Sequence, residues 1–167
     1  MIVEETLPVL PRAVFDCSLY LQAALRRTGP AGRCLDRVEA GEVELLVSMP
    51  VLDEVREVLH RPELKPRRKG RLTDWIADDL LAWMDQHTTL IPEVPALFSY
   101  ARDPDDEPYL NLAVTAGAAY LVTRDRDLLD LQDPDSEPGQ ALRQLAPRLT
   151  ILEPVEFLHR LLPLTDA

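Results

Sequence analysis

Short runs of apolar residues alternate along the chain with longer stretches in which apolar residues recur at helical spacing. The runs lack a regular alternation of apolar and polar positions, which is typical of strands buried on both faces. The predicted strands are 13–15, 45–47, 88–91, 119–122 and 149–152. The predicted helices are 19–27, 31–40, 50–59, 72–86, 106–117, 127–131 and 155–162. The stretches 92–104 and 133–139 are expected to be loops.

The alternation of strands and helices favours an α/β domain built on a parallel sheet that helices cover on both faces. The 167 residues suffice for one domain of ordinary size, which we expect over residues 12–162. Residues 1–11, which include two prolines, are expected to form an extended lead-in, and residues 163–167 a tail.

The charge of the chain is strongly negative and unevenly distributed. There are 18 basic and 29 acidic residues, which gives a formal net charge of −11. This excludes a generally basic nucleic-acid coat protein, although local patches of either sign remain open. Residues 55–72 carry seven basic and two acidic residues, whereas residues 101–137 carry three basic and ten acidic residues.

Several common classes of protein are disfavoured by features that the sequence lacks. The longest uncharged run, 108–123, is too short and too polar for a membrane span, and the first residues lack the basic-then-apolar order of a secretory signal. The two cysteines form neither a CxxC motif nor a disulfide framework, so we expect a cytoplasmic protein. Glycine-rich phosphate loops of the usual patterns are also missing from the sequence.

Four acidic residues stand where predicted strands end or predicted helices begin. Asp16 follows the first strand, and Asp125 follows the strand at 119–122. Asp106 lies in the first turn of a helix, and Glu54 lies in the first turns of the helix after the second strand. Because loops at the carboxyl ends of parallel strands meet at one edge of the sheet, these side chains are expected to lie together there.

Helical geometry separates Glu54 from its acidic neighbours. At about 100° per residue, Glu54 falls at the border of the apolar face of its helix, whereas Asp53 and Glu57 point nearly away from that face. Asp106 lies three residues before Tyr109, on a buried face of its own helix. Glu54 and Asp106 can therefore reach a shared pocket.

Each of these acids, taken singly, also has an ordinary interpretation. An aspartate before a helix commonly caps it, and Asp105 and Asp127 are interpreted first as caps. Asp103 and Asp130 are expected to be solvated. The functional interpretation depends on the occurrence of all four acids together.

Several carboxylates at one edge repel one another and raise each other's pKa values. A hard divalent cation removes this conflict. Carboxylate oxygens suit Mg²⁺ or Mn²⁺, and the sequence shows no His or Cys cluster that points to zinc. Such ions lower the pKa of a bound water and stabilise the attacking and leaving oxygens of a phosphodiester. The expected reaction is therefore hydrolysis of a phosphate ester.

The basic region offers a place for a phosphate backbone beside the acidic site. The residues expected to bind substrate there are Lys65, Arg67, Arg68, Lys69 and Arg71. A solvated loop that leads into a helix is an equally good interpretation of the same residues.

Five motifs stand out along the chain. They are VFDCS (14–18), VSMPVLDEV (47–55), DPDD (103–106), YLVTRDRDLL (120–129) and EPVEFL (153–158). Together they resemble the PIN domain family, and within it the toxins of type II toxin–antitoxin modules. The resemblance implies a three-layer α/β/α sandwich with a central, mostly parallel sheet of four or five strands. It also implies a Mg²⁺- or Mn²⁺-dependent ribonuclease.

The resemblance further implies roles for individual residues and a set of partners. Matched by motif, the catalytic and metal-binding acids are Asp16, Glu54, Asp106 and Asp125, with Asp127 as an auxiliary metal ligand. The family usually has Thr-Asn after the first aspartate, where this chain has Cys17 and Ser18. Ser18 is shorter than asparagine but can still hydrogen-bond a phosphate, so it is expected to bind substrate. The expected partners are RNA, an antitoxin protein and a second copy of the chain in a homodimer. No association with a membrane is expected.

Other classes of protein compete with the ribonuclease. A non-catalytic module of the same fold could use the same edge to hold a protein partner or RNA, and a lack of Mn²⁺ binding would favour it. A phosphatase of the haloacid dehalogenase type needs a second aspartate two residues after the first, where Ser18 stands. A phospho-acceptor receiver domain needs a lysine after a late strand, and the last lysine is Lys69.

Overall fold

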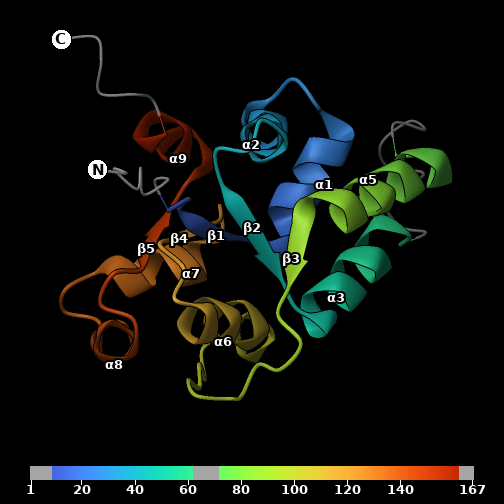
Figure 1. Ribbon diagram of the computed structural model, residues 1–167. Coiled ribbons are helices and arrows are strands. Elements are labelled where there is room, and N and C mark those ends of the chain that lie inside the picture. Colours follow the sequence, from blue (N-terminus) through green and yellow to red (C-terminus); the bar gives the residue numbers. More distant parts are fainter. Residues whose placement is uncertain (1–8, 62–71, 162–167) are drawn as a thin grey trace, which may run out of the picture.

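A computed structural model describes residues 9–61 and 72–161, and a parallel sheet forms its centre (Figure 1). The strands are β1 (Arg12–Phe15), β2 (Glu44–Val47), β3 (Thr88–Leu90), β4 (Tyr120–Val122) and β5 (Thr150–Leu152). They lie in the order β3-β2-β1-β4-β5, and every neighbouring pair is parallel. The predicted strands and their parallel arrangement are therefore confirmed.

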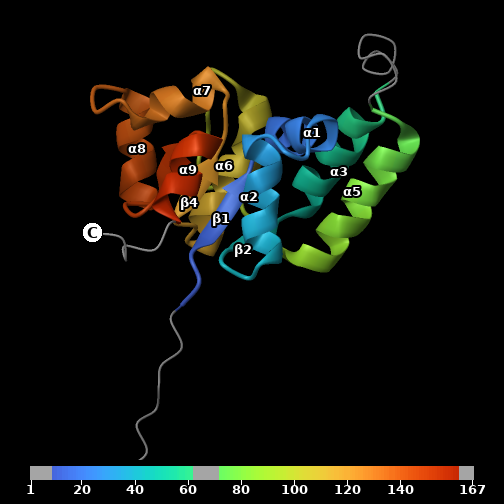
Figure 2. The same ribbon diagram turned by 90° about the horizontal axis from the view of Figure 1, so that it is seen from above.

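Helices cover both faces of the sheet, so the three-layer α/β/α arrangement is confirmed. The helices are α1 (Cys17–Leu25), α2 (Pro30–Glu39), α3 (Met49–Leu59), α5 (Asp74–His87), α6 (Glu107–Ala116), α7 (Arg126–Leu129), α8 (Glu137–Leu145) and α9 (Pro154–Arg160), with single turns η1 (Pro104–Asp106) and η2 (Asp130–Gln132). Figure 1 shows α2 and α9 over one face and α6 and α8 over the other. Seen from above in Figure 2, α3 and α5 lie together at one end of the molecule and α8 at the other. Among the described helices, none combines the length and the apolar surface that crossing a bilayer requires.

The central strand β1 shows why its sequence contains an uninterrupted apolar run. Ala13, Val14 and Phe15 are completely inaccessible to solvent. The ring of Phe15 packs edge-on against Phe157 of α9, with 5.6 Å between the ring centroids. Burying a side chain of this size contributes about 1.5–3 kcal/mol to folding. The packing on both faces of β1 therefore fixes the position of the next residue, Asp16.

The prediction of a loop over 133–139 is wrong for its last three residues. Helix α8 begins at Glu137. The Ser136 side chain caps this helix by accepting a hydrogen bond from the backbone N–H of Gly139 at 3.1 Å. Pro138 lies in the first turn, where a backbone N–H is not needed. Serine, proline and glycine are also typical loop residues, so a polar stretch conceals this helix start.

Candidate functional site

The carboxyl ends of the strands bring residues from distant parts of the chain to one edge of the sheet. Asp16 directly follows β1, and Thr123 and Asp125 follow β4. Ser48 follows β2 and caps α3, accepting a hydrogen bond from the backbone N–H of Val51 at 3.4 Å. Helix α3, which carries one of the predicted acids, therefore starts at the same edge.

One cavity of about 600 Å³ opens at this edge, and the structure brings all four predicted acids into its wall. They are Asp16, Glu54, Asp106 and Asp125. Asp103 and Asp105 also line the cavity, which makes it strongly acidic. By contrast, the side chains of Asp53 and Glu57 are 65% and 69% exposed, so only Glu54 among these neighbours faces the cavity.

Asp16 is held in place by hydrogen bonds from two neighbours. It caps α1 by accepting a hydrogen bond from the backbone N–H of Ser18, and it accepts another from the hydroxyl of Thr123. That hydroxyl in turn accepts a hydrogen bond from the backbone N–H of Asp125 at 2.9 Å. Asp16 is 6% exposed, and burial raises the pKa of its carboxyl although the hydrogen bonds oppose this shift. Thr123 thus links the acids that follow β1 and β4.

Asp106 lacks the support that Asp16 has. Its Oδ2 atom is buried and has no hydrogen-bond partner among the described residues. Burial, followed by the nearby carboxylates of Asp125, Asp103 and Asp16, raises the pKa of the Asp106 carboxyl to about 8. A carboxyl group with a pKa of about 8 is mostly protonated at neutral pH, and a bound cation would favour its ionised form. This observation and the all-oxygen donor set fit a divalent metal ion.

Glu54 is positioned by a buried tyrosine. The Tyr109 hydroxyl donates a hydrogen bond to Glu54 Oε2 at 2.5 Å, and Tyr109 is only 2% exposed. Burial raises the pKa of Glu54, and the hydrogen bond from Tyr109 partly reverses the shift. Burial, followed by the carboxylates of Glu54 and Asp16, also raises the pKa of the Cys17 thiol to about 12, so this thiol is neutral. The tyrosine therefore joins α3 to α6 at the site.

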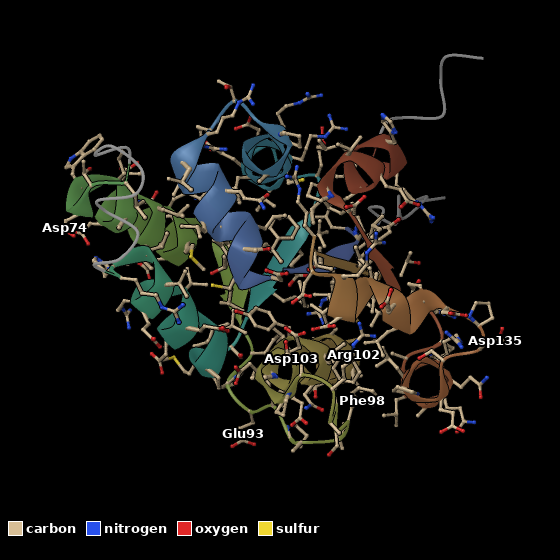
Figure 3. The ribbon with its side chains drawn as sticks, turned by 180° about the vertical axis from the view of Figure 1, so that it is seen from behind. Asp74, Glu93, Phe98, Arg102, Asp103 and Asp135 are labelled. Carbon is tan, nitrogen blue, oxygen red and sulfur yellow. The ribbon has the colours of Figure 1, made fainter. Side chains whose placement is uncertain are left out.

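A second acidic group lies at the edge of the cavity. Carboxylate oxygens of Asp103, Asp125 and Asp127 lie within 4.8 Å of one another, and all three residues are partly buried. Arg102 pairs with Asp127 at 2.7 Å and with Asp130 at 2.9 Å; Figure 3 shows Arg102 and Asp103 beside α6. Asp127, the expected auxiliary ligand, lies outside the cavity wall and has a cationic partner within the protein.

Two capping assignments are wrong, those of Asp105 and Asp127. Asp103, which is partly exposed and lines the cavity, caps η1 by accepting a hydrogen bond from the backbone N–H of Asp105 at 3.1 Å. Asp105 therefore donates its backbone N–H to the capping residue and is not itself the cap. Likewise Asp125, not Asp127, caps α7, at 2.9 Å from the backbone N–H of Asp127. Pro104 after Asp103 is the available signal, because proline favours the first position after a cap.

The residues expected to bind substrate fall into two groups. Ser18 lines the cavity, and its buried hydroxyl lies beside the Asp16 carboxyl, whose ionised form it helps to stabilise. The others lie outside the described residues; they are Lys65, Arg67, Arg68, Lys69 and Arg71. Arg61 and Arg124 also line the cavity, although neither was expected there. The position of Arg124 between two site residues is the signal that could have identified it.

Comparison with known proteins agrees with this fold. Residues 12–127 match the PIN domain family, and the chain therefore belongs to that family. The crystal structure of PAE2754 from Pyrobaculum aerophilum is similar, with a TM-score of 0.53 and 19% identity over 90% of this chain and 89% of that chain. The crystal structure of VapBC2 from Rickettsia felis, bound to a DNA fragment from their promoter, has a TM-score of 0.50 and 14% identity over 85% and 98%. A search of curated proteins finds no significant match.

Proposed function

We propose that this protein is an endoribonuclease that hydrolyses RNA phosphodiester bonds with the help of Mg²⁺ or Mn²⁺. The observation that carries the proposal is the convergence of Asp16, Glu54, Asp106 and Asp125 in one cavity at the carboxyl edge of the sheet. PIN domains are generally nucleases, which supports the same class of reaction. Carboxylate oxygens are the ligands that these hard cations prefer.

The four acids would hold the ion, with Asp127 as a further ligand on the side of the second acidic group. Bound there, the ion would neutralise the carboxylates and stabilise negative charge on the phosphodiester. The protein itself orients the ligands, because Thr123 holds Asp16 and Tyr109 holds Glu54. Ser18, which lines the cavity beside Asp16, would hydrogen-bond a phosphate oxygen.

A polyanionic substrate also needs positive charge near an acidic cavity. Arg124 in the cavity wall would supply such charge, together with Arg61, which also pairs with Glu57 at 3.2 Å. The basic segment also belongs to the proposed binding surface; its residues are Lys65, Arg67, Arg68, Lys69 and Arg71.

We further propose that the protein is the toxin of a toxin–antitoxin pair, with an antitoxin protein as its partner, and that it forms a homodimer. The motifs shared with such toxins and the similarity of fold to VapBC2 support this role. A non-catalytic module that holds a protein or RNA at the same edge is the alternative function, and metal binding distinguishes the two.

Mn²⁺ is expected to bind the purified protein, to stabilise it and to enable RNA cleavage. An ion at 100 times its Kd stabilises the folded state by about 2.7 kcal/mol, which raises the melting temperature by at least about 5 °C for a chain of this length. Titration calorimetry, thermal unfolding and cleavage of labelled RNA measure the three effects, and EDTA should reverse them. A protein that gives no heat, no shift in melting temperature and no cleavage would be the non-catalytic module.

Replacing Tyr109 with phenylalanine is expected to weaken Mn²⁺ binding about tenfold, because Glu54 loses the hydrogen bond that orients it. Titration calorimetry measures the change in Kd. Tyr120→Phe is the matched control, since the Tyr120 ring packs against Phe157 and its hydroxyl makes no hydrogen bond among the described residues. Equal Mn²⁺ affinity of Tyr109→Phe and Tyr120→Phe would exclude a positioning role for Tyr109.

A further inference from the structure

A second cavity adjoins the acidic one. It has a volume of about 330 Å³ and shares Gln22 and Arg124 with the acidic cavity. The rest of its wall comes from the end of α1, with Arg26, and from the start of α2, with Gly29 and Pro30. A polymer that occupies the acidic cavity can therefore continue past Gln22 and Arg124 into this second cavity.

The two arginines of the second cavity form no ion pair with any acidic residue that the structure describes. Within residues 9–61 and 72–161, neither Arg26 nor Arg124 forms a side-chain hydrogen bond or an ion pair. The adjacent Arg27, by contrast, pairs with Asp36 at 3.0 Å and with Glu39 at 3.6 Å. Acidic partners are abundant in a chain with a net charge of −11, so this local excess of positive charge stands out. It leaves the second cavity open to an external anion.

The chain turns closely between α1 and α2 beside Arg26. A Cβ atom at Gly29 would lie 3.3 Å from the Arg26 carbonyl oxygen, which is a tight contact, and 3.4 Å from Arg26 Cδ, which is an ordinary one. Between the two cavities, Gln22 Oε1 is buried and has no hydrogen-bond partner in the described part of the chain. The connection between the cavities thus holds the Gln22 amide and one cation, Arg124.

We propose that the second cavity is a subsite for a backbone phosphate of RNA, next to the phosphodiester that the acids act on; the inference rests on the proposed ribonuclease function. Carboxylates and phosphates repel one another, so the acidic cavity alone disfavours an RNA strand. Arginine binds phosphate oxygens through two parallel N–H groups. Arg26 and Arg124 therefore offset the repulsion and direct the strand across the end of α1.

Arg26→Gln tests the subsite, because Arg26 lines only the second cavity whereas Arg124 lines both. Arg148→Gln is the matched control, since Arg148 is also exposed and precedes β5 at the opposite edge of the sheet. Each variant is made alone and on the Asp16→Asn background, in which labelled RNA is expected to stay intact. The readouts are KM and kcat for cleavage by the single variants, and the salt dependence of binding to single-stranded RNA of mixed sequence on the Asp16→Asn background.

Arg26→Gln is expected to raise KM about two- to fivefold with kcat unchanged. It is also expected to reduce the slope of log K against log salt by about 0.7, the value for one phosphate contact on a single strand. Arg148→Gln should change neither quantity. Equal salt slopes for the two variants would overturn the subsite. If the wild type leaves RNA intact, the ribonuclease proposal fails, but the salt slopes of RNA binding still decide whether the subsite exists. If the protein binds no RNA at all, both the ribonuclease proposal and the subsite are overturned.

Discussion

Replacing Asp16 with asparagine is expected to reduce Mn²⁺-dependent RNA cleavage at least about a hundredfold while the protein stays folded. Asparagine has the same size, and its one carbonyl oxygen can still accept the hydrogen bond from the Ser18 N–H, whereas its NH2 group replaces the oxygen that accepts from the Thr123 hydroxyl. It cannot supply the negative charge that a metal ion requires. The substitution therefore removes the ligand without removing the cap of α1.

Asp133→Asn is the control for this experiment. Asp133 also accepts a hydrogen bond from the backbone N–H two residues further on, at 2.9 Å, but it lies outside the cavity wall. Its replacement should leave cleavage unchanged. Cleavage rates and far-ultraviolet circular dichroism are measured for the wild type and both variants. Equal cleavage by the wild type and by folded Asp16→Asn would exclude the acidic cavity as the catalytic site.

Replacing Asp106 with asparagine is expected to stabilise the metal-free protein, and to do so more at higher pH. In the folded protein the pKa of Asp106 is raised from the ordinary value of 3.8 to about 8, mainly by burial. Between these two values the folded state holds a proton that the unfolded state releases, so the stability of the wild type falls as pH rises and levels off above the folded pKa. Asparagine has no such proton to lose.

The melting temperature of Asp106→Asn in EDTA should exceed that of the wild type by at least about 2 °C at pH 8, and the difference should shrink toward pH 5. In saturating Mn²⁺ the difference should narrow or reverse, because only the wild type keeps the complete set of ligands. Asp53→Asn, on the exposed side of α3, should show no such dependence. A difference that stays constant from pH 5 to pH 8 would contradict the assignment of Asp106 as a carboxyl with a raised pKa.

Most of the fold can be predicted from local patterns, for physical reasons that particular elements illustrate. The run Val14–Phe15 identifies a buried strand because a parallel sheet covered on both faces needs apolar residues on both of its sides. Helix α8 escapes prediction because Ser136 and Pro138 serve loops and helix starts equally well. The order β3-β2-β1-β4-β5 is not encoded in any single run, because it depends on how the crossovers pack.

The sequence by itself determined that acids stand at strand ends and helix starts, and that Glu54 rather than Asp53 or Glu57 faces the protein. These are local properties, set by the helical period and by the ends of the strands. Only the tertiary structure decided that Asp103 joins the cavity, that Arg102 pairs with Asp127, and which arginines border the second cavity. The positions of these residues depend on which crossovers and loops come together at one edge of the sheet. A local sequence pattern does not specify this, because it depends on contacts between distant parts of the chain.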